Sequence, residues 1–147
     1  MSNADEYLKL VPRKYQEEIF DQARHENVIA ALETGSGKTL IAALLVKWVM
    51  AQPSLVGKKT IFLVPKVPLV DQQRSFLAEQ TPLRVRGYTG SMGVESWDKG
   101  RWALEFAQSD CLVMTGIPHL LANECCFTSR RSTDFQRHTN ARVLEHG

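Results

Sequence analysis

The residues best suited to chemistry in this chain form a short glycine-bearing segment between two apolar runs. Residues 34–39 read Thr-Gly-Ser-Gly-Lys-Thr, with the apolar run 28–32 before them and the helix-favouring run 40–50 after them. A turn that joins a strand to a helix in this way directs backbone N–H groups toward a polyphosphate at the positive end of the helix. The segment therefore predicts a phosphate-binding loop.

Each residue type in this loop has a separate role. Glycine at positions 35 and 37 permits backbone conformations that side chains disfavour, and we expect Lys38 to reach the β- and γ-phosphates. The Thr39 hydroxyl is placed to ligate a Mg²⁺ ion. The expected ligands are ATP and Mg²⁺. The residues predicted to bind the nucleotide through this loop are Thr34, Gly35, Ser36, Gly37, Lys38 and Thr39.

Size and composition limit what surrounds the loop. A chain of 147 residues has room for one nucleotide-binding lobe, and a net charge of +2 does not by itself indicate a nucleic-acid partner. We expect an intracellular protein, cytoplasmic or nuclear and without a membrane, because neither a secretory signal nor a run of roughly 18 apolar residues occurs. The three cysteines lack metal or disulfide spacing, and Cys111 lies in an apolar run typical of a buried thiol.

The apolar pattern alternates between strand-like and helix-like segments, which is typical of an α/β fold with a mostly parallel sheet. Residues 128–147 have only Phe135, Val143 and Leu144 as sizeable apolar residues, so we expect a divergent, poorly ordered tail at 117–147 after a partial domain over residues 1–116. A short helix at 117–122 is conceivable within that tail. The predicted helices cover 15–24, 40–50, 69–79 and 96–108, and the predicted strands cover 28–32, 60–64, 83–88 and 110–115.

Residues 12–16 read Pro-Arg-Lys-Tyr-Gln and resemble the Q motif that precedes the phosphate-binding strand of helicases. Together with three later stretches, they make residues 10–115 similar to the first RecA-like lobe of superfamily-two DExD/H helicases, and most similar to the helicase region of Dicer-like ribonucleases. Leu32 stands where the general loop pattern has glycine, a departure that helicase ATPases tolerate. The resemblance implies a RecA-like P-loop fold, with Arg13 and Gln16 as further ATP-binding residues. A glutamine amide can pair with N6 and N7 of adenine.

Two further stretches imply contact with nucleic acid. Residues 64–73 resemble motif Ia of the Dicer and RNA-sensor branch, and residues 88–93 resemble the corresponding stretch of fungal Dicer-like proteins. Residues 113–115 match the start of motif Ic. In that family these turns lie near the nucleic-acid backbone, which implies weak binding of double-stranded RNA. The contact residues implied are Pro65, Lys66, Gln73, Thr89 and Gly90.

The Asp-Glu-x-His element of the family, which organises Mg²⁺ and positions the attacking water, does not occur in this sequence. Residues 123–126, Asn-Glu-Cys-Cys, are no substitute, since asparagine replaces the metal-organising carboxylate. The second RecA-like lobe is also absent from the sequence. We therefore expect a truncated or mis-spliced product, with a sheet incomplete at its C-terminal side, that binds ATP and does not hydrolyse it alone.

Two other interpretations remain open from the sequence. The first is a P-loop enzyme of another class, such as a kinase, which would need an acceptor site and a downstream carboxylate. The second is a non-enzymatic fragment that binds RNA weakly. The sequence leaves the oligomeric state undetermined.

Overall fold

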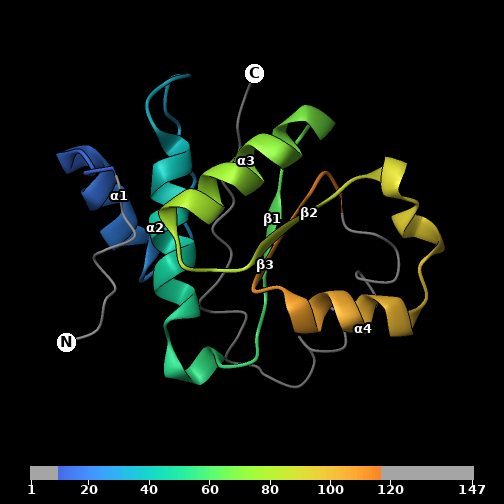
Figure 1. Cartoon of the computed structure of the whole chain (residues 1–147). Coiled ribbons are helices and arrows are strands. Elements are labelled where there is room, and N and C mark those ends of the chain that lie inside the picture. Colours follow the sequence, from blue (N-terminus) through green and yellow to red (C-terminus); the bar gives the residue numbers. More distant parts are fainter. Residues whose placement is uncertain (1–9, 117–147) are drawn as a thin grey trace.

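A three-stranded parallel sheet forms the centre of the computed structural model, which describes residues 10–116. The strands are β1 (Thr60–Leu63), β2 (Val85–Tyr88) and β3 (Cys111–Met114), in the order β1-β3-β2. The register places Leu63 and Tyr88 on either side of Met114. The carboxyl ends of all three strands therefore meet at one edge of the sheet (Figure 1). The predicted α/β class with a parallel sheet is confirmed.

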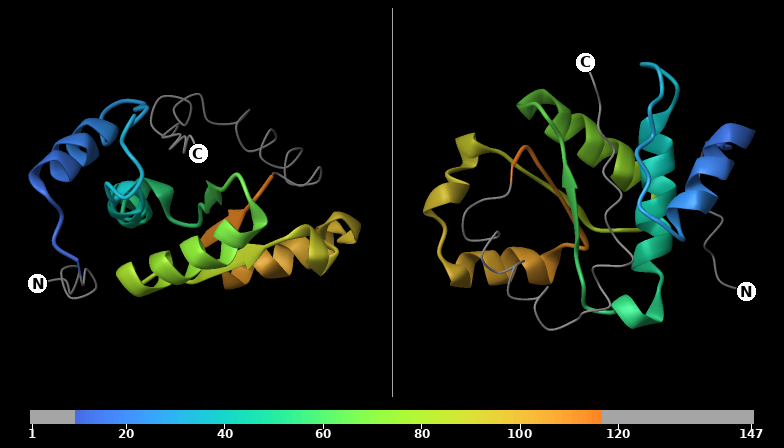
Figure 2. Two further views of the ribbon diagram at one scale, coloured as in Figure 1. Left: turned by 90° about the horizontal axis from the view of Figure 1, so that it is seen from above. Right: turned by 180° about the vertical axis from the view of Figure 1, so that it is seen from behind.

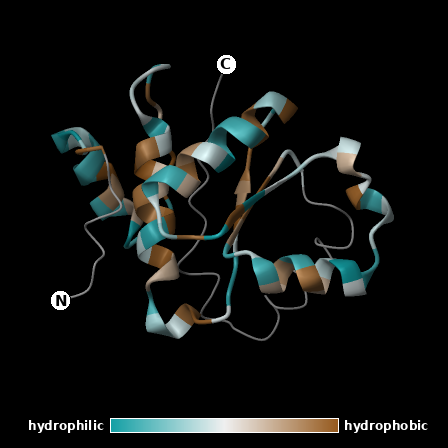
Figure 3. Ribbon diagram, in the orientation of Figure 1, coloured by the Kyte–Doolittle hydropathy of each residue, from teal (hydrophilic) through white to brown (hydrophobic). Residues whose placement is uncertain are grey.

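Helices cover both faces of this sheet. One face packs against α2 (Lys38–Met50) and α3 (Val67–Gln80), and the other packs against α4 (Lys99–Gln108). The first helix, α1 (Lys14–Ala23), lies against α2, on the side away from the strands (Figure 2). Hydropathy follows these positions, because α2 is mainly hydrophobic and α1 is mainly hydrophilic (Figure 3). Short 3₁₀ helices cover Pro53–Leu55, Gly90–Met92 and Val94–Ser96.

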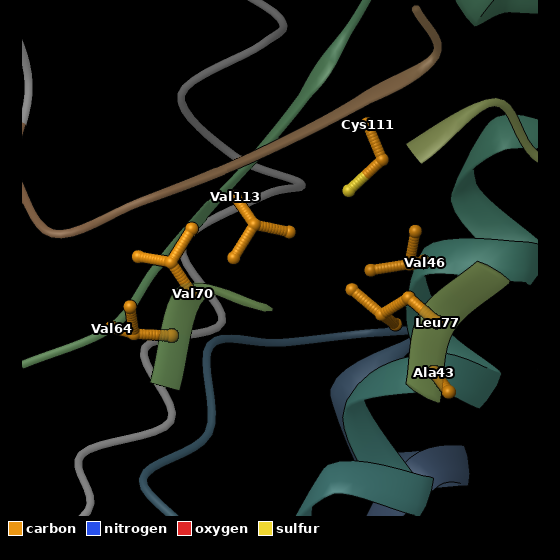
Figure 4. Packing of buried hydrophobic residues seen from close by; sticks show 7 residues of the cluster. All are labelled: Ala43, Val46, Val64, Val70, Leu77, Cys111 and Val113. Atoms are coloured by element: carbon orange, nitrogen blue, oxygen red, sulfur yellow. The ribbon is translucent and has the colours of Figure 1, made fainter. Parts of the chain in front are cut away.

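The central strand β3 divides the core into two clusters. Successive side chains of a strand point to opposite faces, and all four residues of β3 are buried. Cys111 and Val113 therefore join Leu77 of α3 in one cluster (Figure 4), and Leu112 and Met114 join Trp102 in the other. Burial raises the pKa of the Cys111 thiol to about 12. The prediction that Cys111 is a core thiol is confirmed.

Most predicted elements occur within a few residues of their expected bounds. The third helix begins at Val67, before its predicted start at Leu69, because Pro68 is tolerated in the first turn of a helix. The fourth helix begins later than predicted, at Lys99. Its N-cap residue is Asp98, whose carboxylate accepts a hydrogen bond from the Arg101 N–H at 2.8 Å.

The predicted strand at 28–32 is wrong. These residues run extended beside α2, yet they pair with no strand within residues 10–116, and Ile29 is 72% exposed. An isolated extended segment lacks the ladder hydrogen bonds that define a strand, whatever its apolar pattern. The segment still delivers the chain to the loop at 34–39, on the same side of the molecule as the carboxyl ends of the strands (Figure 1).

The predictions for the tail at 117–147, including the short helix at 117–122 and the assessment of residues 123–126, lie outside the described residues. Within residues 10–116, no helix has both the length and the apolar character that crossing a membrane requires.

Candidate nucleotide-binding site

The predicted loop adopts the backbone geometry that its glycines allow. Gly35 and Gly37 have φ angles of +82° and +81°, in the left-handed region that favours glycine. The loop turns through a hydrogen bond from the Ser36 N–H to the Glu33 carbonyl at 3.2 Å. Helix α2 then begins at Lys38, with Gly37 as its N-cap. The first N–H groups of α2 thus stand at the positive end of the helix, where an anion is favoured.

Helix α1 holds this loop from outside. The Tyr15 hydroxyl donates a hydrogen bond to the Ser36 carbonyl, and the Gln16 amide Nε2 donates to the carbonyls of Ser36 and Gly37 at 3.2 and 3.1 Å. The contact is close, because a Cβ added at Gly37 would lie 2.2 Å from Gln16 Nε2. We call Tyr15 and Gln16 the α1 clamp. It fixes two carbonyls of the loop on the side that faces α1.

Gln16 has a structural role in this conformation. Its side chain is buried, and its carbonyl oxygen Oε1 accepts the Arg13 backbone N–H at 2.8 Å, as in one half of a capping box. Both ends of the amide therefore hold protein groups, whereas Arg13 is exposed. The predicted reading of adenine by Gln16 requires the amide to exchange one of these partners. The loop contact of Tyr15 was not predicted, although its place beside Gln16 in the first turn of α1 was the available signal.

Two polar groups of the loop are suited to a phosphate. Lys38 Nζ donates to the Leu32 carbonyl at 3.0 Å, which holds the ammonium group at the start of the loop. The Ser36 hydroxyl oxygen is buried and has no hydrogen-bond partner among the residues that the structure describes. A buried hydroxyl without a partner is costly unless a ligand or water satisfies it. These groups fit a polyphosphate with its magnesium ion.

The residues predicted to contact nucleic acid divide into two groups. Pro65 and Lys66 follow β1, Thr89 and Gly90 follow β2, and the parallel register brings both pairs to the carboxyl edge of the sheet. Pro65, Lys66 and Gly90 are exposed, and Thr89 is half-buried. Gln73 differs, because it is 6% exposed and lies in the body of α3. The nucleic-acid contact predicted for Gln73 therefore stays a prediction for a side chain that is buried in this structure.

A parallel sheet between helices, with a glycine-bearing loop clamped at the N-terminus of α2, defines a P-loop nucleotide-binding domain of the RecA-like class. Residues 13–137 match the family model described as DEAD/DEAH box helicase. This protein belongs to the DEAD/DEAH box helicase family. The match extends beyond residue 116, and the domain boundary predicted there remains a prediction.

Relatives and a solved structure agree with this assignment. Endoribonuclease Dicer homolog 1 of Arabidopsis thaliana is 49% identical over 105 residues, which are 70% of this chain and 6% of the plant protein. Dicer-like protein 1 of Aspergillus terreus is 42% identical over 123 residues, 79% of this chain and 8% of the fungal protein. The chain therefore spans 6–8% of the length of these curated relatives.

The crystal structure of the Pyrococcus furiosus Hef helicase domain superposes with a TM-score of 0.60 at 27% identity. The superposition covers 80% of this chain and 23% of that one. The predicted RecA-like fold and the resemblance to Dicer-like helicase regions are thus confirmed.

Proposed function

We propose that this chain binds ATP with Mg²⁺ at the loop of residues 34–39, as the ATP-binding part of a Dicer-like helicase domain. The observation that carries the proposal is the loop itself. Its two glycines are in left-handed conformations, its outer carbonyls are held by the α1 clamp, and the buried Ser36 hydroxyl lacks a partner among the described residues. Such a loop presents main-chain N–H groups and one ammonium group to a polyphosphate.

The chain's own residues divide the task. The Lys38 ammonium group exchanges the Leu32 carbonyl for phosphate oxygens, and the Thr39 hydroxyl serves as a ligand of the magnesium ion. Arg13 precedes α1 and Thr34 begins the loop, and both are exposed. Bound Mg-ATP would supply a phosphoanhydride bond, and the metal would partly neutralise the negative charge of the phosphate oxygens. The chain alone does not cleave that bond, because the sequence lacks the Asp-Glu-x-His element that positions the attacking water.

Thermal and chemical unfolding with nucleotide tests the proposal. Mg-ATP at 100 times its dissociation constant is expected to stabilise the folded chain by about 2.7 kcal/mol, and Mg-GTP by clearly less. Lys38→Ala is expected to abolish the gain from ATP, while Lys58→Ala, which removes an exposed lysine outside the loop, retains it. Phosphate release in the same samples is expected to stay at the level of the blank.

The possible outcomes separate the alternatives. Equal stabilisation by GTP would remove the adenine-reading role of Gln16 and favour a P-loop enzyme of another class. No stabilisation by either nucleotide, in a chain that unfolds cooperatively, would overturn the proposal. A chain that binds RNA but no nucleotide would support the non-enzymatic alternative.

We further propose that the carboxyl edge of the sheet binds the backbone of double-stranded RNA weakly, inside the cell, in the cytoplasm or the nucleus. The proposal is supported by the exposed Lys66, which is the N-cap of α3, and by Thr89 and Gly90 two strands away at the same edge. A lysine at the positive end of a helix offers a phosphate a point charge.

Fluorescence anisotropy with a short RNA duplex measures this contact. Lys66→Ala is expected to weaken binding for every duplex sequence and to lower the slope of log affinity against log salt by about 1. Lys58→Ala is the matched control, since it removes the same charge from an exposed position away from this edge. Unchanged affinity and slope in Lys66→Ala would exclude the proposed contact.

A further inference from the structure

The outer edge of β2 forms the floor of an open groove between α3 and α4. The groove has a volume of about 330 Å³, and its lining includes Val85 and Gly87 of β2, Arg74 of α3, Arg101 of α4 and Met92. Within residues 10–116, β2 pairs on one side only, with β3. The groove therefore follows a strand edge that is open to an added strand.

The backbone of β2 leaves alternate groups free along this groove. The Arg84 carbonyl accepts the N–H groups of Asp110, directly before β3, and of Cys111 in β3, at 2.8 and 3.3 Å. Because a parallel strand directs its backbone groups to opposite sides at alternate residues, Arg86 also faces β3. Val85 and Gly87 then direct their N–H and C=O groups into the groove. Both residues are partly exposed.

The walls of the groove are positively charged. Arg74, Arg86 and Arg101 line it, with side chains 37%, 42% and 55% exposed. The carboxylate of Glu105 also lines it, but that side chain is 8% exposed and is held by Arg86 at 2.7 Å and Arg101 at 3.1 Å.

The net charge of the groove lining stays positive when the other polar contacts are included. Glu105 accepts a further hydrogen bond from the Tyr88 hydroxyl at 3.0 Å, and Asp71, which pairs with Arg74 at 2.8 Å, has a side chain 83% exposed to solvent outside the lining. The groove thus combines free strand hydrogen-bonding groups with an excess of arginine.

We propose that this groove binds an acidic segment of another protein, which adds in an extended conformation as a strand beside β2. Addition of a strand supplies main-chain hydrogen bonds to Val85 and Gly87, and alternate side chains of the segment face α3 or α4. Acidic side chains on the α4 side meet Arg86 and Arg101, and one on the α3 side meets Arg74. The segment therefore carries carboxylates at alternate positions, with small or β-branched residues between them.

The alternative role for the same arginines is to protect the edge of β2 from pairing, since charged residues on an edge strand discourage pairing with other chains. Protection predicts that no extended peptide binds here, whereas the proposal predicts selective binding of acidic ones. RNA is the other anionic partner to separate, because arginine side chains also contact phosphates.

The full chain is titrated with a fluorescent nine-residue peptide that alternates glutamate with valine or threonine. We expect saturable binding of this peptide and none of its lysine analogue or of an analogue with proline at the positions that pair with β2. Arg74→Ala and Arg101→Ala are each expected to weaken binding by about two- to fivefold. Arg84→Ala is the matched control, because it removes an exposed arginine directly before β2 that pairs with Asp110 and lies outside the lining.

Amide hydrogen exchange locates the contact. The acidic peptide is expected to slow exchange at Val85 and Gly87 and to leave Arg86, already bonded to β3, unchanged. Binding of the lysine analogue, unchanged exchange at Val85 and Gly87, or equal affinity in Arg74→Ala and Arg101→Ala would each overturn the proposal. Protection of the same amides by an RNA duplex, without binding of the peptide, would assign the groove to nucleic acid instead.

Discussion

Gly37→Ala is expected to destabilise the chain more than Gly35→Ala does, and to abolish the stabilisation by Mg-ATP. Both glycines have φ near +80°, so each alanine adds backbone strain of about 1–2 kcal/mol. They differ in their surroundings, because a Cβ at Gly37 would lie 2.2 Å from Gln16 Nε2, while a Cβ at Gly35 would meet nothing within 4 Å. The new methyl group must displace Gln16 from the carbonyls of Ser36 and Gly37. Urea unfolding without nucleotide measures the stability difference, and unfolding with Mg-ATP measures binding.

A second pair of variants isolates the role of the clamp. In a Gln16→Ala background, the extra loss in Gly37→Ala relative to Gly35→Ala is expected to disappear, since the colliding amide is gone. If the two alanine variants lose the same stability with and without Gln16, then the α1 clamp does not shape the loop.

Leu77→Ala is expected to lower the free energy of unfolding by about 2–5 kcal/mol. Leu77 is fully buried where α3 meets the sheet, in the cluster that Val70, Cys111 and Val113 also form (Figure 4). Removing its side chain leaves a cavity that the strands cannot fill without moving. Urea unfolding followed by circular dichroism measures the loss.

Two companion variants make this result specific. Leu104→Ala makes the same substitution on α4 at a residue that is 59% exposed, and the loss there is expected to stay within about 0.5 kcal/mol. Leu77→Met preserves most of the volume and is expected to cost less than about 1.5 kcal/mol, so it folds even if Leu77→Ala does not. Equal losses in Leu77→Ala and Leu104→Ala would contradict the position of Leu77 in the core.

Much of the fold could be predicted because its signals are local. The buried run at Cys111–Met114, the mainly apolar helix after the loop and the glycines at 35 and 37 each predict their conformation from neighbouring residues alone. The error at 28–32 shows the limit of this reasoning, since an apolar run becomes a strand only where another strand pairs with it.

The candidate site shows the same division between local and distant interactions. The loop residues 34–39 were predicted from their types and order, but the attachment of the loop to Tyr15 and Gln16 joins residues about twenty positions apart in sequence. Gln73 matched a family pattern, yet α3 turns it inward and buries it.

The sequence by itself determined that a glycine-bearing loop lies at the start of a buried helix, and that strands and helices alternate after it. The tertiary structure alone decided which strands pair, which amides hold the loop, and which edge of the sheet stays open between α3 and α4. The physical reason is that backbone preference and apolar periodicity act between near neighbours in the chain. Pairing, burial and the satisfaction of single polar groups depend instead on segments that meet only when the chain folds.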